Sequence, residues 1–445
     1  MKGAELPRLI LVQVPTLLAT FWRRLVKRPA APRPAGKNPP SYIVFRLDAL
    51  GDVVLTTPLF SAIKSANPKA RCCVVVQSAY KSLLATNPHV DEVLGLPRVP
   101  AWLPTTIQRL LAALGFYWRH LRSRQFDFVI VPRWDVDEHF ATLLCVLATA
   151  TCRVGYSSST SAAKERWNRG FDKAFDVCLE PGPVRHEVLR NLAIAEALGL
   201  SHGAAKLDIC VTEHDRRRAT RILSAVSEDL RLIALGIGAA SPGRRWPLQL
   251  YAETINRLGA SQRIQPLILC ASAEGDEAAQ LAALLQRPPM VLAGAPLRDV
   301  AAVLERCDLF LGNDSGCAHL AAAMGCKTIV ISRHPKDGDP NHYNSPVRFA
   351  PQGVHVRVLQ PDRGKGGCTQ ACTAPEPHCI TQVSAGDVVL AAEQMLALKA
   401  PRNNPHAGLK APSRELLQAH STEAIRRVML ALNKEGEPPV QRGQA

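Results

Sequence analysis

The sequence predicts an α/β protein built from two doubly wound domains in tandem. The chain has 445 residues, which is more than one hydrophobic core usually supports. In residues 41–205, and again in 231–400, short apolar runs alternate with helical patterns, as in parallel sheets that carry helices on both faces. The polar stretch 206–230 separates the two patterns and is interpreted as a linker.

The apolar runs give the expected strands. In the first domain they are YIVFRL (42–47), CCVVVQS (72–78) and FDFVIVP (126–132), with helices expected at Thr57–Ser65 and 186–200, the second capped by Gly199. In the second domain they are LIALGIGA (232–239), PLILCAS (266–272), DLFLGN (308–313) and TIVIS (328–332). Ligands of such sheets bind at the carboxyl ends of the strands, so the strand-to-helix turns are the expected site, facing a cleft between the domains.

The two ends of the chain lie outside this pattern. Residues 1–40 contain an apolar run, Leu9–Trp22, that is too short to span a bilayer and is followed by basic residues. A secretory signal has its charges before the run, so we expect either an interfacial segment on anionic lipid or a packed extension. Residues 29–40 are a proline-rich spacer, and the tail 401–445 is expected to hold one amphipathic helix, 414–432.

The formal net charge is +16, and much of it comes from residues 1–40, which hold eight Lys and Arg against Glu5 alone. The sequence has no arginine-rich helix or aromatic-interleaved basic stripe, so we expect no nucleic-acid partner. Most of the 13 cysteines sit singly in apolar runs, where thiols pack as small hydrophobic groups. A reducing compartment, the cytoplasm, is therefore expected.

The first turn that could carry chemistry is RLDALGDVVLTTP, residues 46–58. Gly51 gives the backbone freedom to bend, and Asp52 follows it at the mouth of the turn. The Asp52 carboxylate is a candidate general base for an acceptor hydroxyl, or simply the N-cap of the next helix. Asp48, in the same turn, is the other candidate for this general base.

The second turn, GIGAASPGRRWP (236–247), is a glycine-rich loop that ends in two arginines. Backbone N–H groups of such loops, here around Gly238, approach phosphate closely. Arg244 or Arg245 could neutralise charge on a departing diphosphate. The plain alternative is a connection with solvated arginines.

The third turn, GNDSGCAHLAAAMG (312–325), leads from a strand into a helix of small residues. The amides of a helix N-terminus bind anions, and Gly316 lets a diphosphate approach. Ser315 could donate to phosphate and Asp314 could hold sugar hydroxyls. An ordinary capped helix, with His319 as a packed core residue, is the alternative.

Two other groups resemble metal sites. Asp135 and Asp137 have the Asp-x-Asp spacing that chelates divalent metal in some glycosyltransferases, but two carboxylates do not complete a site. Cys368, Cys372 and Cys379, with His378, have a spacing that is loose for zinc. We expect unliganded thiols there, with a structural metal or a redox pair as the alternatives.

Taken together, five blocks resemble the lipopolysaccharide heptosyltransferases of glycosyltransferase family 9. In order they are FRLDALGDVVLTTPLFSAIKSANP, HEVLRNLAIAEALGL, GIGAASPGRRWPLQLYAE, DLFLGNDSGCAHLAAAMG and CTQACTAPEPHCITQVSAGDVV. The resemblance covers about residues 41–395 and implies two facing Rossmann-like domains of the GT-B type.

The resemblance implies an inverting, metal-independent transfer that needs no cofactor, with Asp52 as base and Arg244 beside the departing diphosphate. It places Gly51, Gly238, Arg245, Asp314, Ser315, Gly316 and His319 around a nucleotide-sugar donor. Arg244 stands where the family generally has lysine, and guanidinium is not a simple replacement for ammonium. The implied reaction moves heptose from ADP-heptose to a lipid-linked saccharide at the inner membrane.

Other functions are a transferase for another nucleotide sugar, or a membrane-docked nucleotide-binding protein without transferase activity. An oxidoreductase is disfavoured because the first turn lacks G-x-G-x-x-G.

Overall fold

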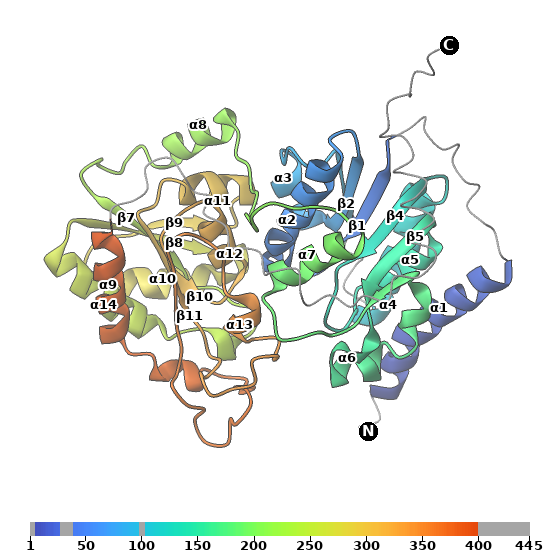
Figure 1. The fold of residues 1–445 in the computed structure, drawn as a ribbon. Helices are drawn as coiled ribbons and strands as arrows, with labels where there is room; N and C mark the ends of the chain where they lie inside the picture. Colours follow the sequence, from blue (N-terminus) through green and yellow to red (C-terminus); the bar gives the residue numbers. More distant parts are fainter. Residues whose placement is uncertain (1–4, 27–38, 98–102, 399–445) are drawn as a thin grey trace, which may run out of the picture.

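The computed structural model describes residues 5–26, 39–97 and 103–398, and it contains two six-stranded sheets side by side (Figure 1). The tail 401–445 with its expected helix, and all of the spacer except its last two residues, lie outside the described residues. Within the described part no helix is both long enough and apolar enough to cross a membrane.

The first domain contains β1 (Ser41–Phe45), β2 (Arg71–Gln77), β3 (Glu92–Leu96), β4 (Gln125–Val131), β5 (Thr149–Tyr156) and β6 (Val177–Leu179). Its helices are α2 (Leu50–Ala66), α3 (Lys81–Leu84), α4 (Thr105–Phe116), α5 (Ala141–Leu147), α6 (Ala162–Trp167) and α7 (Glu187–Ala197), preceded by α1 (Glu5–Val26). The sheet is parallel in the order β3-β2-β1-β4-β5-β6. Every residue of β1 is buried, because helices cover both faces.

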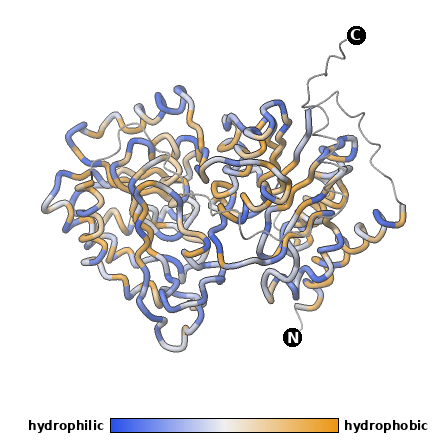
Figure 2. The backbone as a smooth tube through the Cα atoms, in the orientation of Figure 1, coloured by the Kyte–Doolittle hydropathy of each residue, from blue (hydrophilic) through white to orange (hydrophobic). Residues whose placement is uncertain are grey.

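The second domain repeats this topology. Its strands are β7 (Arg231–Gly236), β8 (Ile264–Cys270), β9 (Met290–Ala293), β10 (Leu309–Asn313), β11 (Thr328–Ile331) and β12 (Val356–Leu359), in the parallel order β12-β11-β10-β7-β8-β9. Its helices are α9 (Leu248–Ser261), α10 (Gly275–Leu284), α11 (Leu297–Leu304), α12 (Gly316–Ala323), α13 (Pro346–Phe349) and α14 (Ala385–Ala397). The predicted two-domain α/β class is thus confirmed. In Figure 2 the hydrophobic residues are concentrated in the interior of both domains, where the sheets lie.

Strands β3, β5, β6, β9 and β12 were not among the predicted strands, and two other elements differ from the sequence-based expectation. The helix expected from Thr57 begins earlier, at Leu50, so Gly51 and Asp52 lie in its first turn. The expected linker contains α8 (Glu213–Ile222), which packs on α11 of the second domain. A capping box between Thr212 and Asp215 begins α8, a local signal that the polar composition obscured.

A buried arginine joins the two domains. Arg348 of α13 donates to both carboxylate oxygens of Asp135 at 3.0 and 2.8 Å and lies 3.8 Å from Glu187. Its guanidinium also covers the ring of Trp134, 4.4 Å from the centroid. Because Arg348 is 1% exposed, its charge depends on these partners in the first domain.

We expect Arg348→Met to lower the free energy of unfolding by about 3–5 kcal/mol, because it leaves the Asp135 carboxylate without the cation that donates to both of its oxygens. Urea denaturation followed by tryptophan fluorescence measures this loss. Arg257→Met is the matched control: Arg257 forms an exposed pair with Glu253, so its removal should change stability by less than about 1 kcal/mol. Equal stabilities of the two variants would contradict the bridging role.

Candidate active site

The candidate site lies where the strand order reverses in both sheets. In the first domain the reversal falls between β1 and β4, and in the second between β7 and β10. Helices α2 and α12 start near these points and pack on each other across the domain junction. Ligands of doubly wound sheets bind at such positions, so the junction is the expected binding region.

Arg46, at the end of β1, organises the first-domain side. It is fully buried, donates to Pro132 O at 2.7 Å, and its Nη2 lies 2.8 Å from Asp52 Oδ1 and 3.1 Å from Glu187 Oε1. Asp48 lies 3.5 Å from its Nε. Burial alone would lower the pKa of Arg46, but the carboxylates of Asp52, Asp48 and Glu187 outweigh it and raise the pKa.

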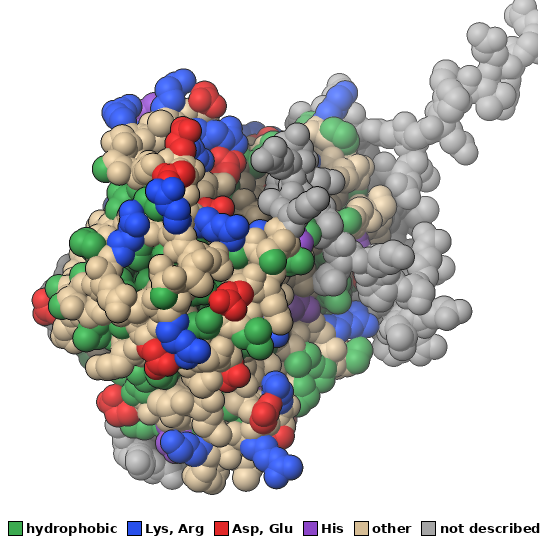
Figure 3. Space-filling model, turned by 90° about the vertical axis from the view of Figure 1, so that its left-hand side faces the viewer, with side chains coloured by type: hydrophobic (Ala, Val, Ile, Leu, Met, Phe, Trp, Pro, Cys, Tyr) green, Lys and Arg blue, Asp and Glu red, His purple; other side chains and the backbone are tan. Residues whose placement is uncertain are grey.

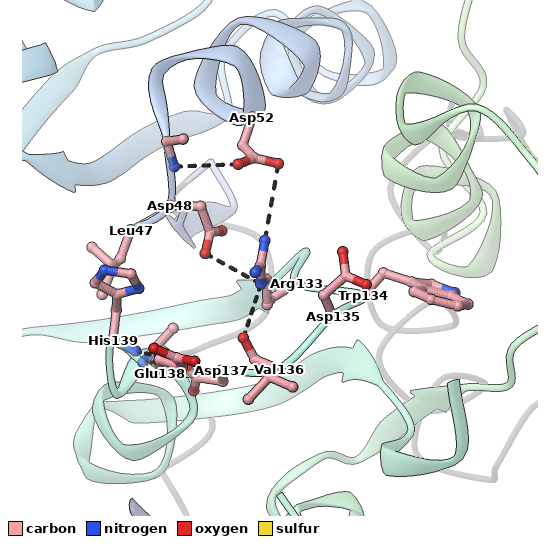
Figure 4. Close-up of polar contacts among 12 residues, drawn as sticks. Leu47, Asp48, Asp52, Arg133, Trp134, Asp135, Val136, Asp137, Glu138 and His139 are labelled. Carbon is pink, nitrogen blue, oxygen red and sulfur yellow. Dashed lines mark hydrogen bonds and ion pairs between the residues drawn. The ribbon is translucent and has the colours of Figure 1, made fainter. Parts of the chain in front are cut away.

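Asp52 projects from the first turn of α2 toward Arg133, on the same side as Asp48 (Figure 4). Its Oδ2 accepts from the Ala49 N–H at 3.2 Å, and Arg133 Nη1 lies 4.0 Å from its Oδ1. The carboxylate thus accepts a backbone hydrogen bond at the N-terminus of α2 and also pairs with Arg46. Its side chain remains 13% exposed, so part of the carboxylate is open to a ligand.

The second-domain side consists of the loops after β7 and β10. Arg244 Nη2 donates to Asp314 Oδ2 at 2.7 Å and to Asp314 O at 2.8 Å. Asn313 is buried and links the two loops, because its Nδ2 donates to Ile237 O at 2.7 Å and its Oδ1 accepts from the Trp246 N–H at 2.8 Å. Arg244 is therefore presented from a fixed loop.

The two sides meet closely. A Cβ added at Gly51 would lie 2.7 Å from the His319 ring, and one at Gly316 would lie 2.7 Å from the side chain of Leu50. Burial lowers the pKa of His319, while Asp314 and Asp52 oppose the shift and Arg244 adds to it. The structure therefore brings Gly51, Asp52, Arg244, Asp314, Gly316 and His319 together. Ser315 is the N-cap residue of α12, and its side chain makes no capping hydrogen bond.

Arg245 and Gly238 belong to a neighbouring cluster. Arg245 donates to Glu277 Oε1 at 2.8 Å and lies 3.4 Å from Glu274 Oε1. A Cβ at Gly238 would lie 2.5 Å from the Glu274 carboxylate. Arg245 is thus held by acidic side chains beside the glycine loop, whereas Arg244 is held by Asp314.

The Asp-x-Asp pair is divided between two structural roles. Asp135 pairs with Arg348, and Asp137 accepts from the backbone N–H groups of His139, Ala141 and Thr142 at the start of α5. The two carboxylates therefore serve different partners.

Sequence reasoning missed the arginines Arg46, Arg133 and Arg348. Two of them carried a signal, since Arg46 and Arg133 stand directly at the carboxyl ends of expected strands. A charged residue at the end of a buried strand is a candidate for a site at the sheet edge. Arg348 carried no such signal.

Two facing domains, each with a parallel six-stranded sheet, are the architecture of the GT-B glycosyltransferases. The model of glycosyltransferase family 9 (heptosyltransferase) matches residues 115–342, just over half of the chain. The chain belongs to this family and is a glycosyltransferase.

Individual relatives support this family assignment. Lipopolysaccharide heptosyltransferase 3 of Escherichia coli K12 is 25% identical over 81% of this chain and 99% of its own length. The core heptosyltransferase OpsX of Haemophilus influenzae is 24% identical over 70% of this chain and 82% of its own. Among solved structures, a family 9 glycosyltransferase from Veillonella parvula is similar with a TM-score of 0.63 at 21% identity, covering 81% of this chain and 99% of that one. The E. coli heptosyltransferase WaaC with ADP gives 0.58 at 19% identity, covering 80% and 99%.

The two neighbouring arginines provide a matched test of this geometry. The sequence-based assignment of Arg244 to the diphosphate of the donor predicts that Arg244→Ala weakens binding of ADP by about 10-fold or more, because a charge-assisted contact to phosphate is worth about 1.5–3 kcal/mol. Arg245→Ala removes contacts to Glu274 and Glu277 and should have the smaller effect. Isothermal titration calorimetry with ADP measures both. A larger loss in Arg245→Ala would contradict the assignment.

Proposed function

We propose that this glycosyltransferase moves heptose from ADP-heptose onto the inner core of lipopolysaccharide or a related lipid-linked saccharide, with inversion at the anomeric carbon. The observation that carries the proposal is the approach of the α2 and α12 N-termini, which sets Asp52 opposite Arg244 and Asp314 around His319. The names of the lipopolysaccharide heptosyltransferase 3 and OpsX relatives, which match most of this chain, support heptose as the transferred sugar and lipopolysaccharide as the acceptor class.

Asp52 is the proposed general base. Its carboxylate accepts the proton of an acceptor hydroxyl as that oxygen attacks the anomeric carbon from the face opposite the departing ADP. Arg46 and the Ala49 N–H hold the carboxylate while leaving it partly exposed. Asp48 also lies near Arg46 and Arg133, at 3.5 and 3.3 Å, and its side chain is slightly more buried, at 9% exposure against 13% for Asp52.

The second domain supplies the proposed donor site. The N-terminal amides of α12 at Ser315 and Gly316 can receive the diphosphate, and the Arg244 guanidinium can balance the negative charge that grows as ADP departs. Asp314 orients Arg244 and is in reach of sugar hydroxyls. Arg245 and Glu274 support the loop at Gly238.

We also propose that the chemical step uses no divalent metal at the diphosphate. Arginine and helix amides supply positive charge where a metal-dependent enzyme uses Mg²⁺ or Mn²⁺. Adding either ion should then leave the rate of transfer unchanged. A rate that requires added Mg²⁺ or Mn²⁺ would contradict this part of the proposal.

Removal of the base gives the direct test. Asp52→Asn should lower kcat about 10²–10⁴-fold, because the asparagine amide cannot take the proton, while ADP still binds. The assay measures ADP released from ADP-heptose in the presence of truncated lipopolysaccharide. Asp48→Asn is the control and should keep more activity than Asp52→Asn.

The reverse order of activities would assign the base to Asp48. Turnover with another nucleotide sugar, but not with ADP-heptose, would retain the mechanism and refute the donor.

Helix α1 is the proposed contact with the membrane. Its large apolar side chains Leu6, Ile10, Val14, Leu18, Phe21, Trp22 and Leu25, here named the apolar face of α1, are all exposed. The opposite side, with Val12, Thr16 and Thr20, is buried against the first domain, where α1 packs on α5 and α4 (Figure 1). Arg23 and Arg24 lie in its last turn. An exposed apolar face with flanking cations is typical of helices that lie on anionic lipid.

On the face of the second domain in Figure 3, Lys and Arg side chains are interspersed with Asp and Glu. An acceptor held in a membrane would be brought near the first domain by α1, on the same side of the junction as Asp52. We propose that the enzyme contacts the inner face of the inner membrane through α1, the location that the family resemblance implies.

Changing Leu18, Phe21 and Trp22 to Ser together should reduce binding to phosphatidylglycerol-containing vesicles about 10-fold or more, since burying each large apolar side chain is worth about 1.5–3 kcal/mol. Co-sedimentation measures the bound fraction. The control changes Leu284, Val291 and Leu390, exposed apolar residues of the second domain, to Ser. Equal binding of both triple variants would refute the docking role of α1.

A further inference from the structure

Four potential metal ligands converge in the loop between β12 and α14. The side chains are those of Cys368, Cys372, His378 and Cys379, and their ligand atoms all lie within 4.8 Å of one another. The sulfur atoms of Cys368, Cys372 and Cys379 lie 3.6, 4.0 and 3.5 Å from Nδ1 of His378. These residues are loosely spaced in the sequence, but the fold brings their side chains together.

These distances match a tetrahedral centre. Bonds of about 2.3 Å from metal to sulfur and about 2.0–2.1 Å from metal to nitrogen place the two ligand atoms about 3.6 Å apart at a tetrahedral angle. A disulfide would instead bring two sulfur atoms to about 2.05 Å, and all three cysteines are free thiols here. The arrangement is therefore that of ligands around a shared point.

Hydrogen bonding alone does not account for the cluster. Nδ1 of a neutral imidazole either donates one hydrogen bond or accepts one. Three sulfur atoms surround this one nitrogen, so thiols alone would leave most of these contacts unsatisfied. A metal ion can bind all four atoms at once.

The loop also needs a cross-link. Residues 361–378 form no helix or strand and contain no Leu, Ile, Val, Met, Phe, Tyr or Trp. Loops of this length without regular structure are uncommon in compact domains unless they carry a function. Nevertheless, Cys372 and Cys379 are only 1% and 0% exposed. Burial of apolar side chains cannot hold such a segment, whereas metal binding can.

The backbone is shaped around the sulfur atoms. Gly366 and Gly367 both have positive φ, 46° and 86°, a conformation that favours glycine and turns the chain back toward His378. In the same turn the Lys365 N–H donates to Cys379 Sγ at 3.3 Å. Hydrogen bonds from the surroundings to ligand atoms orient and tune metal sites.

We propose that Cys368, Cys372, His378 and Cys379 bind one divalent metal ion in tetrahedral coordination, as three thiolates and one imidazole. Binding releases the three thiol protons. Zn²⁺ is the ion that this closed donor set favours, and Fe²⁺ shares the chemistry. With no ligand position left for a substrate, the ion is structural.

The metal-bound loop braces the proposed donor site. Arg333 Nη1 donates to Ala374 O at 3.2 Å, and a Cβ at Gly243, next to Arg244, would overlap Ala374 O. The Trp246 Nε1–H donates to Val383 O at 2.9 Å, just beyond Cys379. Metal binding therefore fixes the segment against which the Arg244 loop rests. This consequence depends on the proposed function, whereas metal binding itself does not.

Elemental analysis of the full-length protein, purified without added metal or chelator, tests the proposal. We expect about one zinc or iron ion per chain, consistent with a single four-ligand site. Cys368→Ser and Cys379→Ser should each lower bound metal about 10-fold or more. Cys210→Ser, a half-buried thiol outside the loop, is the control and should keep the metal. Zinc and iron are distinguished by the element found.

Replacing the ion by Co²⁺ gives a second readout, because a tetrahedral thiolate site then absorbs strongly in the visible range. Cys368 is the most exposed of the three cysteines, so Cys368→Ser is the variant most suited to fold without the ion. A wild-type protein without stoichiometric metal, or a disulfide among the three cysteines by mass spectrometry, would overturn the proposal. Bound metal without turnover of ADP-heptose would refute the proposed donor and leave the metal site standing.

Discussion

The buried guanidinium of Arg46 is the interaction on which the first-domain side of the site depends. A cation at 0% exposure is stable only if carboxylates and carbonyls surround it. Its partners come from three separate elements: Asp52 from α2, Glu187 from α7 and Pro132 O from the end of β4. The orientation of the proposed base is thus a consequence of pairing a buried charge, and the same pairing ties α2 and α7 to the sheet.

In the second domain, hydrogen bonds of a neutral side chain hold the loops of the site together. Buried Asn313 connects the loops after β7 and β10, and these loops carry Arg244 and Asp314. Both domains have the same strand order, and the helices that start at the two points of reversal, α2 and α12, pack on each other across the junction. These helices pack so closely that a Cβ at Gly51 or at Gly316 would clash with a side chain of the facing helix. Steric contact therefore sets the separation between the proposed base and the proposed donor site.

Two further features, helix α1 and the loop 361–378, depend on how many apolar side chains the local sequence contains. Helix α1 buries one side on the first domain and has an apolar face that the described part of the chain leaves exposed. The loop 361–378 has the opposite composition, with no large apolar side chain to bury. For α1 the proposed partner is a lipid surface, and for the loop it is the proposed metal ion bound by three sulfur atoms and an imidazole.

The sequence alone determined the two-domain α/β fold and the position of its three polar turns. Strands buried on both faces appear as continuous apolar runs such as YIVF, and the residues after them must lie at one edge of a parallel sheet. Only the tertiary structure decided the partners: Arg46 meets Glu187, 141 positions away, Arg348 joins the two domains, and Arg245 pairs with Glu274 while its neighbour pairs with Asp314. It also closed the loose cysteine spacing into one cluster. Such contacts depend on which distant side chains the packing brings within reach, and local sequence patterns carry no record of that.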